Sequence, residues 1–266
     1  MTTTELDAQA GRTTDGPPRP AVVLTEVSKV YGRGPQACLA VDRLSLEVRA
    51  GEFVCLVGAS GCGKSTLLSM ISGLEPVSGG SITIDGGHRP ALMFQESALF
   101  PWLTVRGNVE LALRLRGVSR SDREPEAREL LASVHLADFA DKRPHELSGG
   151  MRQRVALART LAQRTPVLLM DEPFGALDAM TRDMLHDEIE RICRERALTV
   201  VFVTHNVREA ARLGDRIVLL SSRPGLVVAE YPVDIPRPRR IDSPEIATLS
   251  ATVTDRLREE VRRHGH

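Results

Sequence analysis

Aromatic residues, cysteines and charge of one sign are all scarce in this sequence. Only 3% of its 266 residues are aromatic, and four are cysteine. Lys and Arg together number 35 and Asp and Glu together number 35, so the formal net charge is zero. Proteins that bind nucleic acid usually carry a basic excess, so this balance argues against that class. The hydrophobic share of 42% and the charged share of 26% are ordinary for a globular domain.

Three further absences bear on compartment and on metal chemistry. The cysteines lack C-x-x-C spacing, which predicts neither a zinc site nor a disulfide framework. The sequence has no run of about 18 apolar residues, so we expect no segment to span a bilayer. Residues 1–20 are rich in Thr, Asp, Gly and Pro and contain no apolar stretch. They therefore predict a disordered lead-in rather than a signal peptide, and a cytosolic chain.

Short β-branched runs alternate with helical stretches along the chain, which is typical of an α/β protein. The runs predict strands at residues 22–31, 44–48, 53–57, 81–85, 91–94, 167–171, 199–204, 217–220 and 226–231. Residues 104–164 are rich in Leu, Ala, Arg and Glu, so this part is expected to be mainly helical. We therefore predict a strand-centred domain at residues 21–235 with a helical subdomain inserted at about 97–164.

Residues 236–266 form a separate C-terminal segment. It opens with a basic linker, Pro-Arg-Pro-Arg-Arg at 236–240. Apolar residues then recur at helical spacing, at Ile246, Leu249, Val253, Leu257 and Val261. This spacing predicts an amphipathic helix. Packing of that helix on its own domain is the favoured interpretation, and binding to a partner is the alternative.

The strongest motif is a phosphate-binding loop at residues 58–65, which matches G-x-x-x-x-G-K-[ST] in full. An apolar strand precedes it and a helical stretch follows from Thr66, as the motif requires. The glycines allow backbone N–H groups to surround phosphate oxygens, and the helix N-terminus adds partial positive charge. Lys64 can reach the β and γ phosphates, and the Ser65 hydroxyl can ligate Mg²⁺. The residues predicted to bind nucleotide here are Gly58, Ala59, Ser60, Gly61, Cys62, Gly63, Lys64, Ser65 and Thr66.

Two acidic residues follow a second buried strand. Asp171 ends the apolar run 167–171 and can hold the metal ion, while Glu172 can polarise an attacking water. Taken alone, these residues could simply be an acidic turn. The paired phosphate loop makes the catalytic interpretation the stronger one.

A second glycine-rich segment, Leu-Ser-Gly-Gly-Met at 147–151, precedes a helical run and is suited to bind an anion. Taken alone, it would be an ordinary Ser148 N-cap. Segments 58–65 and 147–151 each place a helix N-terminus where it can bind phosphate. A protein with two such segments can enclose one nucleotide from both sides.

Over about residues 21–235 the sequence resembles the nucleotide-binding subunits of ABC transporters. Residues 58–65 match the Walker A motif of that family, Asp171 with Glu172 its Walker B motif and catalytic glutamate, and 147–151 its signature loop. Met151 stands where the family usually has Gln. The other matches are Gln95 in the Q-loop, Asp178 in the D-loop, His205 as the switch histidine and Tyr31 as the aromatic that stacks on adenine.

The resemblance implies a P-loop α/β core with an antiparallel β flank and an inserted helical subdomain. It implies hydrolysis of ATP with Mg²⁺. The catalytic residues that it implies are Glu172, His205, Lys64 and Gln95, and the metal ligands are Ser65, Gln95 and Asp171. It also implies a homodimer that shares the nucleotide through Ser148, Gly149 and Gly150, with Asp178 as a further nucleotide-binding residue.

The resemblance also implies partners, because the chain has no membrane segment of its own. These are two permease transmembrane subunits and, indirectly, an extracytoplasmic solute-binding protein, with this chain at the cytoplasmic face of the membrane. Trp102 is a candidate contact with the permease, and a core-packed tryptophan is the equal alternative.

The subfamily of nitrate, sulfonate and taurine importers is the most similar, in segments 95–102, 171–178, 221–225 and 235–240. The last segment favours aliphatic sulfonates as the solute, with nitrate or taurine next. A soluble ABC ATPase that acts on nucleic acid or ribosomes is the main alternative. A GTPase is disfavoured because the N-K-x-D sequence is absent. A scaffold without activity is disfavoured because Lys64 and Glu172 are both present.

Overall fold

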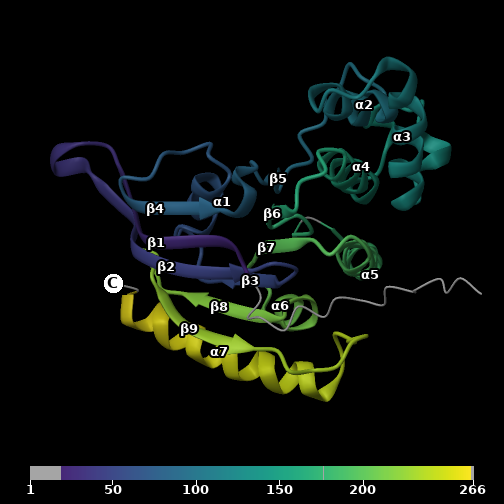
Figure 1. Ribbon diagram of the computed structural model, residues 1–266. Coiled ribbons are helices and arrows are strands. Elements are labelled where there is room, and N and C mark those ends of the chain that lie inside the picture. Colours follow the sequence, from purple (N-terminus) through teal and green to yellow (C-terminus); the bar gives the residue numbers. More distant parts are fainter. Residues whose placement is uncertain (1–18, 176, 265–266) are drawn as a thin grey trace, which may run out of the picture.

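The computed structural model describes residues 19–175 and 177–264, and Figure 1 shows their arrangement. The lead-in predicted for residues 1–20 lies almost wholly outside the described residues. The strands are β1 (Pro20–Tyr31), β2 (Cys38–Arg49), β3 (Phe53–Val57), β4 (Gly79–Ile84), β5 (Ala91–Met93), β6 (Val167–Asp171), β7 (Thr199–Thr204), β8 (Arg216–Leu220) and β9 (Val227–Pro232). The α-helices are α1 (Lys64–Ile71), α2 (Val105–Leu115), α3 (Arg120–Ser133), α4 (Gly149–Leu161), α5 (Ala179–Glu195), α6 (Val207–Leu213) and α7 (Pro244–His264).

A six-stranded sheet forms the centre of the molecule, in the order β5-β6-β7-β3-β8-β9. Its strands pair in parallel except β9, which runs antiparallel to β8. Both faces are buried, since alternate residues of one strand join different apolar clusters. Val54 and Leu56 of β3 pack on the side of α1, whereas Phe53 and Cys55 pack with the helices of the opposite side. Continuous apolar strands of this kind are expected of a parallel sheet covered on both faces.

A three-stranded antiparallel sheet, in the order β2-β1-β4, packs on the α1 side. The antiparallel flank is therefore present, but β2 is longer than the predicted strand 44–48. It pairs with β1 from Arg49 back to Cys38. Several register shifts interrupt that pairing. Such bulges break the alternation of apolar and polar residues, which hid the first half of the strand from the sequence pattern.

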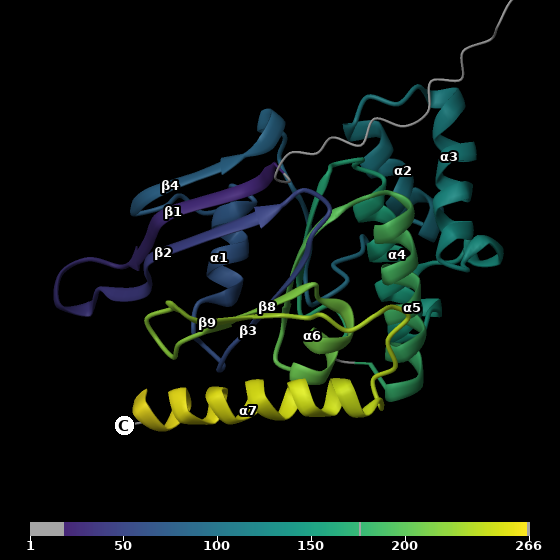
Figure 2. The same cartoon turned by 60° about the horizontal axis from the view of Figure 1, so that its bottom comes forward.

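The helical subdomain consists of α2, α3 and α4, which lie together beside the sheets in Figures 1 and 2. Each of α2 and α4 begins at a hydroxyl cap. Thr104 accepts the N–H of Gly107 at 3.0 Å, and Ser148 accepts the N–H of Met151 at 3.3 Å. Side chains of α4 also reach back to the core, because α4 packs against β5. The subdomain is therefore joined to the nucleotide-binding part of the chain through its last helix.

The segment predicted to be a basic linker is tied to the domain. Arg239 is only 6% exposed. Its guanidinium donates to backbone carbonyls at the end of α6 and to those of Val233 and Ile235, which precede Arg239 in the sequence. Burial lowers the pKa of Arg239 from its usual value, and the neighbouring Arg237 acts in the same direction. Ile246 and Val253 of α7 are fully buried. The helix therefore packs on its own domain, as favoured from the sequence, and it lies along α6 in Figure 2.

None of the helices among the described residues is both long and apolar enough to cross a membrane. The four cysteines are free thiols. Burial raises the pKa of the Cys193 thiol to about 12 and that of the Cys55 thiol well above its usual value. Buried thiols of this kind are inert toward oxidation and metals.

Candidate functional site

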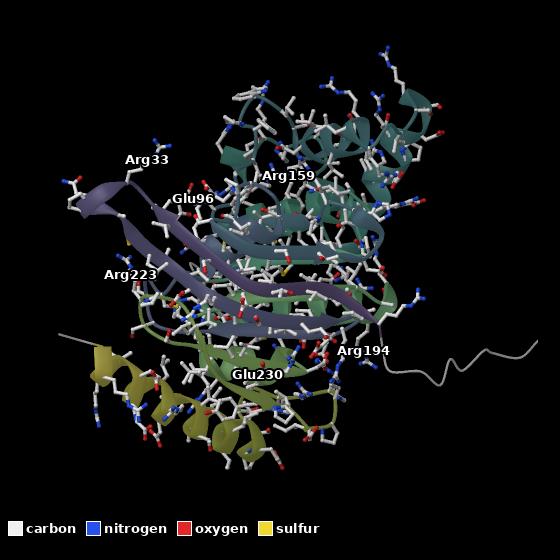
Figure 3. The ribbon with its side chains drawn as sticks, turned by 60° about the vertical axis from the view of Figure 1, so that its left-hand side comes forward. Arg33, Glu96, Arg159, Arg194, Arg223 and Glu230 are labelled. Carbon is white, nitrogen blue, oxygen red and sulfur yellow. The ribbon has the colours of Figure 1, made fainter. Side chains whose placement is uncertain are left out.

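The phosphate-binding loop connects β3 to α1. Gly63 caps α1 with φ 96°, and a Cβ there would lie 2.8 Å from the carbonyl oxygen of Ala40, so only glycine is accommodated. No side chain caps the start of α1. The first N–H groups of the helix are therefore left for a ligand, and the dipole of the helix favours an anion there. Arg223, labelled in Figure 3, lies beside this loop and its Nε donates to the carbonyl of Gly61 at 3.4 Å.

Lys64 lies inside the loop rather than in solvent. Its side chain is 6% exposed, and its Nζ donates to the carbonyls of Gly58 at 2.8 Å and Ala59 at 2.9 Å. The Sγ of Cys62 is 3.7 Å from the same ammonium group. A buried cation held by neutral carbonyls has no counter-charge in these contacts, so an incoming phosphate would supply one.

Ser65 and Asp171 come from different parts of the sequence and meet at the carboxyl end of the sheet. Burial raises the pKa of the Asp171 carboxyl, while the Ser65 hydroxyl donates a hydrogen bond that lowers it. Glu172 raises the pKa further and Lys64 lowers it. A hydroxyl and a carboxylate are the hard oxygen ligands that Mg²⁺ prefers, together with phosphate oxygens and waters. The described residues contain no group of three or more His, Cys, Asp or Glu that could hold a metal. Ser65 and Asp171 would supply two ligands to an ion that nucleotide phosphates also hold.

Glu172 and His205 form the second close pair of the site. Oε2 of Glu172 lies 2.8 Å from Nδ1 of His205, although the two residues follow different strands. Glu172 has φ 43°, a left-handed backbone conformation that is uncommon for a non-glycine residue. Its N–H donates to the carbonyl of Val203 at 3.0 Å, which helps to hold the turn. Other non-glycine residues, among them Arg43 and Ala98, also have positive φ, so it is the contact with His205 that singles out Glu172.

The signature segment lies on a different part of the chain from the phosphate loop. Both views place α4, which follows Ser148, in the helical subdomain and away from α1. Ser148 and Gly149 are exposed, whereas Gly150 is buried. A Cβ on Gly150 would lie 2.3 Å from Cγ2 of Thr181 on α5, so glycine is required there by packing within the chain. Ser148 and Gly149 are left available to a ligand outside their own subdomain.

The remaining predicted residues come from the ends of strands in both sheets. Gln95 follows β5, is exposed, and accepts a hydrogen bond on its carbonyl from Nε2 of Gln153 at 2.6 Å. Tyr31 ends β1 and is 39% exposed, and its hydroxyl lies 3.5 Å from Oγ1 of Thr66. Lys29 covers one face of the Tyr31 ring, with Nζ 4.9 Å from the ring centroid.

Asp178 caps α5 by accepting the N–H of Thr181 at 3.0 Å. That backbone hydrogen bond lowers the pKa of the Asp178 carboxyl. Ser60 is exposed in the phosphate loop.

Trp102 is 67% exposed, so the alternative of a core-packed tryptophan is wrong. Its ring lies 5.3 Å from that of Phe100, and both line a hollow of about 430 Å³. A neighbouring hollow of about 600 Å³ shares Phe100 and Leu111 with it and adds Phe94 and Leu115. Leu115 is 79% exposed. Exposed apolar side chains gathered around two adjoining hollows, with arginines at the margin, are typical of a protein interaction site.

Two residues that hold the Q-loop were missed in the sequence. Gln153 is buried on α4 and donates to Gln95, and Arg159, labelled in Figure 3, donates to the carbonyls of Ser97 and Ala98 at 2.8 and 2.7 Å. Gln153 shares the i, i+4, i+7 face with the buried Leu157 and Thr160. A polar residue on an apolar helical face was the available signal.

The ABC transporter family matches this chain over residues 41–175. The chain belongs to that family. It is 44% identical over 239 residues to the taurine import ATP-binding protein TauB of Rhizobium johnstonii, covering 87% of this chain and 90% of that protein. It is 43% identical over 219 residues to the nitrate import ATP-binding protein NrtD of Synechocystis, covering 80% and 82%.

Other relatives are longer. The chain is 45% identical over 237 residues to the bicarbonate transport ATP-binding protein CmpC of Synechocystis, which covers 84% of this chain but 36% of that protein. It thus spans about a third of the length of the CmpC relatives.

Solved structures establish the fold. The dimeric structure of MJ0796, a bacterial ABC transporter cassette, aligns with TM-score 0.73 and 35% identity, covering 80% of this chain and 99% of the cassette. A post-hydrolysis structure of the same cassette, bound to ADP and Pi, aligns with TM-score 0.72 and 34% identity over the same shares. The predicted P-loop core with an antiparallel flank and a helical subdomain is therefore confirmed as the ABC ATPase fold.

Proposed function

We propose that the chain binds and hydrolyses ATP and powers an importer of small anions through a separate permease. The carrying observation is the Glu172–His205 contact at 2.8 Å, one residue after the Asp171 that receives the Ser65 hydrogen bond. A carboxylate next to the metal-binding pair is placed to take a proton from water. Nδ1 of His205 is engaged by Glu172, which leaves Nε2 of the same ring for the terminal phosphate.

The residues present fit Mg²⁺ with ATP. Ser65 and Asp171 would hold the ion, and Gln95 is the third ligand that the resemblance implies. When bound, the ion would neutralise charge on the β and γ phosphates. Lys64 and the N–H groups at the start of α1 would bind the phosphates, and Tyr31 would stack on adenine through the ring face that Lys29 leaves uncovered.

Replacing Lys64 by Ala is expected to raise the dissociation constant for ATP by at least about tenfold, because one charge-assisted contact to phosphate is lost. Equilibrium titration with a fluorescent ATP analogue measures this change. Lys142→Ala is the matched control, since Lys142 is exposed in the helical subdomain and pairs only with Glu146 in the contacts of the described residues. Unchanged affinity in Lys64→Ala would contradict the assignment of residues 58–65.

We propose that two copies share each nucleotide, and the separation of α1 and α4 within one copy supports this. We assign Ser148, Gly149 and Gly150, together with Asp178, to the nucleotide of a second copy. The similarity to a dimeric cassette supports this assignment. Residues 21–235 would form the ATPase unit, and 236–266 a C-terminal buttress against α6.

The groove around Phe100, Trp102 and Leu115 would receive the permease, two copies of which would place the dimer at the cytoplasmic face of the membrane. Its exposed apolar side chains support a protein partner at this surface. An extracytoplasmic solute-binding protein would deliver the solute to the permease.

The solute that we propose is an aliphatic sulfonate, with nitrate or taurine next. The relatives named for taurine and nitrate support a small anion, and taurine is itself a sulfonate. This chain would not contact the solute, so the assignment needs a transport experiment.

A strain without this gene is expected to stop growing on an alkanesulfonate as the sole sulfur source while growing normally on sulfate. Radiolabelled uptake of sulfonate, taurine and nitrate in that strain measures specificity. Wild-type protein should restore uptake, and Glu172→Gln protein should not. Normal sulfonate uptake in a deletion strain with no redundant importer would contradict the sulfonate assignment, and loss of nitrate uptake alone would replace it.

A further inference from the structure

Three buried polar side chains form a hydrogen-bonded network close to the Glu172–His205 pair. The hydrolysis described above does not use this network. Its members are Thr204 at the end of β7, Glu209 on α6 and His186 on α5, which are 2%, 5% and 0% exposed. Oε1 of Glu209 lies 2.6 Å from Nε2 of His186, and Oε2 of Glu209 accepts the hydroxyl of Thr204. A carboxylate accepts hydrogen bonds, so Nε2 of His186 is the donor to Glu209.

At its Thr204 end, this network contacts the backbone that follows His205. The N–H of Asn206 donates to Oγ1 of Thr204 at 3.0 Å. The side-chain oxygen of Asn206 in turn accepts the N–H groups of Arg208 and Glu209 at 3.0 and 3.3 Å. His205 lies between Thr204 and Asn206, which this network holds by hydrogen bonds. The side chain of His205 is nevertheless 65% exposed. These hydrogen bonds connect the backbone on either side of His205 to Glu209.

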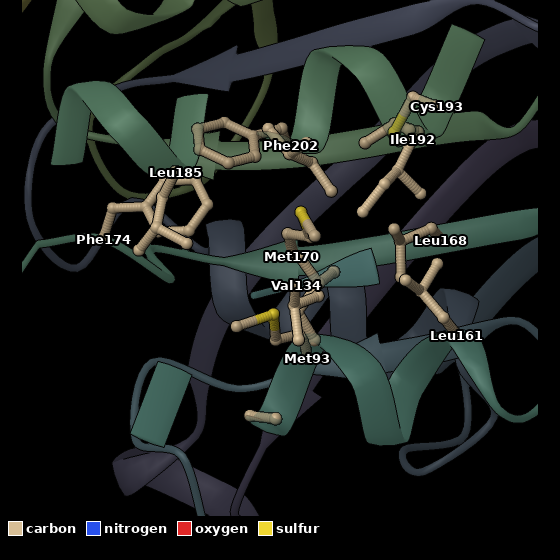
Figure 4. Close-up of a cluster of buried hydrophobic side chains, with 14 of the residues drawn as sticks. Met93, Val134, Leu161, Leu168, Met170, Phe174, Leu185, Ile192, Cys193 and Phe202 are labelled. Carbon is tan, nitrogen blue, oxygen red and sulfur yellow. The ribbon is translucent and has the colours of Figure 1, made fainter. Parts of the chain in front are cut away.

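At its His186 end, the network packs against the loop that carries Glu172. Phe174 follows closely in that loop, is 1% exposed, and its ring lies 5.5 Å from the ring of His186 in an edge-on arrangement. Phe202 lies 5.9 Å from Phe174. Figure 4 shows Phe174 and Leu185 close together, with Phe202 on the same side of the cluster. His186 thus contacts the Glu172 loop by packing and the His205 turn through Glu209.

We propose that Glu209 and His186 are positioning residues that set the 2.8 Å contact between Glu172 and His205. This inference rests on the proposed hydrolysis. Burying a carboxylate costs free energy unless its oxygens accept hydrogen bonds. The network therefore favours the one arrangement of α5, α6 and the end of β7 in which both oxygens of Glu209 are hydrogen-bonded. Both residues are buried, so neither would touch a nucleotide bound at the surface of the site. Their effect acts through the orientation of the catalytic pair, where a displacement of about 1 Å can reduce rate strongly.

The test is steady-state ATP hydrolysis by the full chain. His186→Leu removes the donor to Glu209 while filling the apolar space, and we expect kcat to fall at least about tenfold with KM for ATP changed less than about twofold. His186→Gln restores a donor, and kcat should return to within about threefold of wild type. Thr204→Val, which removes the hydroxyl between Glu209 and Asn206, should reproduce the loss if His186→Leu does not fold.

Two comparisons separate positioning from general stability. Asp187→Ala breaks the other ion pair between α5 and α6, that of Asp187 with Arg212, and should leave kcat within about twofold. In a His205→Ala background, adding His186→Leu should cause a smaller further loss than it causes in wild type, because the Glu172–His205 contact that His186 helps to set is already gone. Thermal unfolding of every variant reports whether the fold is retained.

The inference is overturned by any of four results. These are unchanged kcat in a folded His186→Leu or Thr204→Val variant, equal losses in the Gln and Leu variants, an equal loss in Asp187→Ala, or fully additive losses with His205→Ala. A wild-type chain that binds ATP but never hydrolyses it, even with its permease, would instead contradict the proposed function.

Discussion

Glu172→Gln is expected to reduce ATP turnover at least about a hundredfold while ATP still binds. The amide of Gln cannot take a proton from the attacking water, yet it keeps the size and the hydrogen-bonding reach of the carboxylate toward His205. Phosphate release at saturating ATP measures turnover, and titration with a fluorescent ATP analogue measures binding. The change should fall on kcat rather than on affinity, since Lys64 and the start of α1 would bind the phosphates.

The matched control for this prediction is Glu129→Gln, which makes the same chemical change at an exposed position of α3. It should leave both turnover and affinity unchanged. A Glu172→Gln variant that hydrolysed ATP at a rate close to that of wild type would show that Glu172 is not the base. Loss of ATP binding in that variant would place the carboxylate in phosphate binding instead.

The second large effect concerns assembly. In the Glu172→Gln background, ATP is expected to convert monomer to dimer, because hydrolysis no longer removes the nucleotide that joins two copies. Adding Ser148→Arg should abolish the dimer, since a bulky cation would occupy the space that the terminal phosphate needs at the start of α4. ATP affinity of the monomer should stay nearly unchanged. Analytical ultracentrifugation with and without ATP follows both species.

Ser121→Arg is the control for this experiment, because it places the same cation at an exposed serine elsewhere in the helical subdomain. The dimer should survive that change. Loss of monomer ATP binding in Ser148→Arg would assign Ser148 to the pocket of its own chain and contradict the shared site. A Glu172→Gln protein that stays monomeric at saturating ATP would contradict dimerisation driven by nucleotide alone.

Much of the site could be predicted because its parts are local. A phosphate loop is a strand, a glycine-rich turn and a helix start in one continuous segment, so residues 58–65 identify themselves by spacing. Asp171 is similarly marked by the apolar strand β6 before it. The predicted strands 53–57, 167–171 and 199–204 coincide with β3, β6 and β7, since fully buried parallel strands are continuous apolar runs.

The partners of these residues could not be predicted in the same way. Gly150 is predicted to bind phosphate, but its position in the sequence does not reveal that a Cβ there would lie 2.3 Å from Cγ2 of Thr181 on α5. Arg239 reads as part of a basic linker, yet its charge is enclosed by carbonyls at the end of α6. Both outcomes depend on contacts between segments distant in sequence.

The sequence by itself determined the phosphate loop, the acidic strand end and the family, because these are fixed by residue type and spacing within short segments. Only the tertiary structure decided that Glu172 adopts φ 43° and contacts His205, and that Glu209 links the turn of His205 to His186. The physical reason is that backbone hydrogen bonding and apolar periodicity are properties of neighbouring residues. The pairing of buried polar groups instead depends on which strand ends and helices the completed sheet brings together.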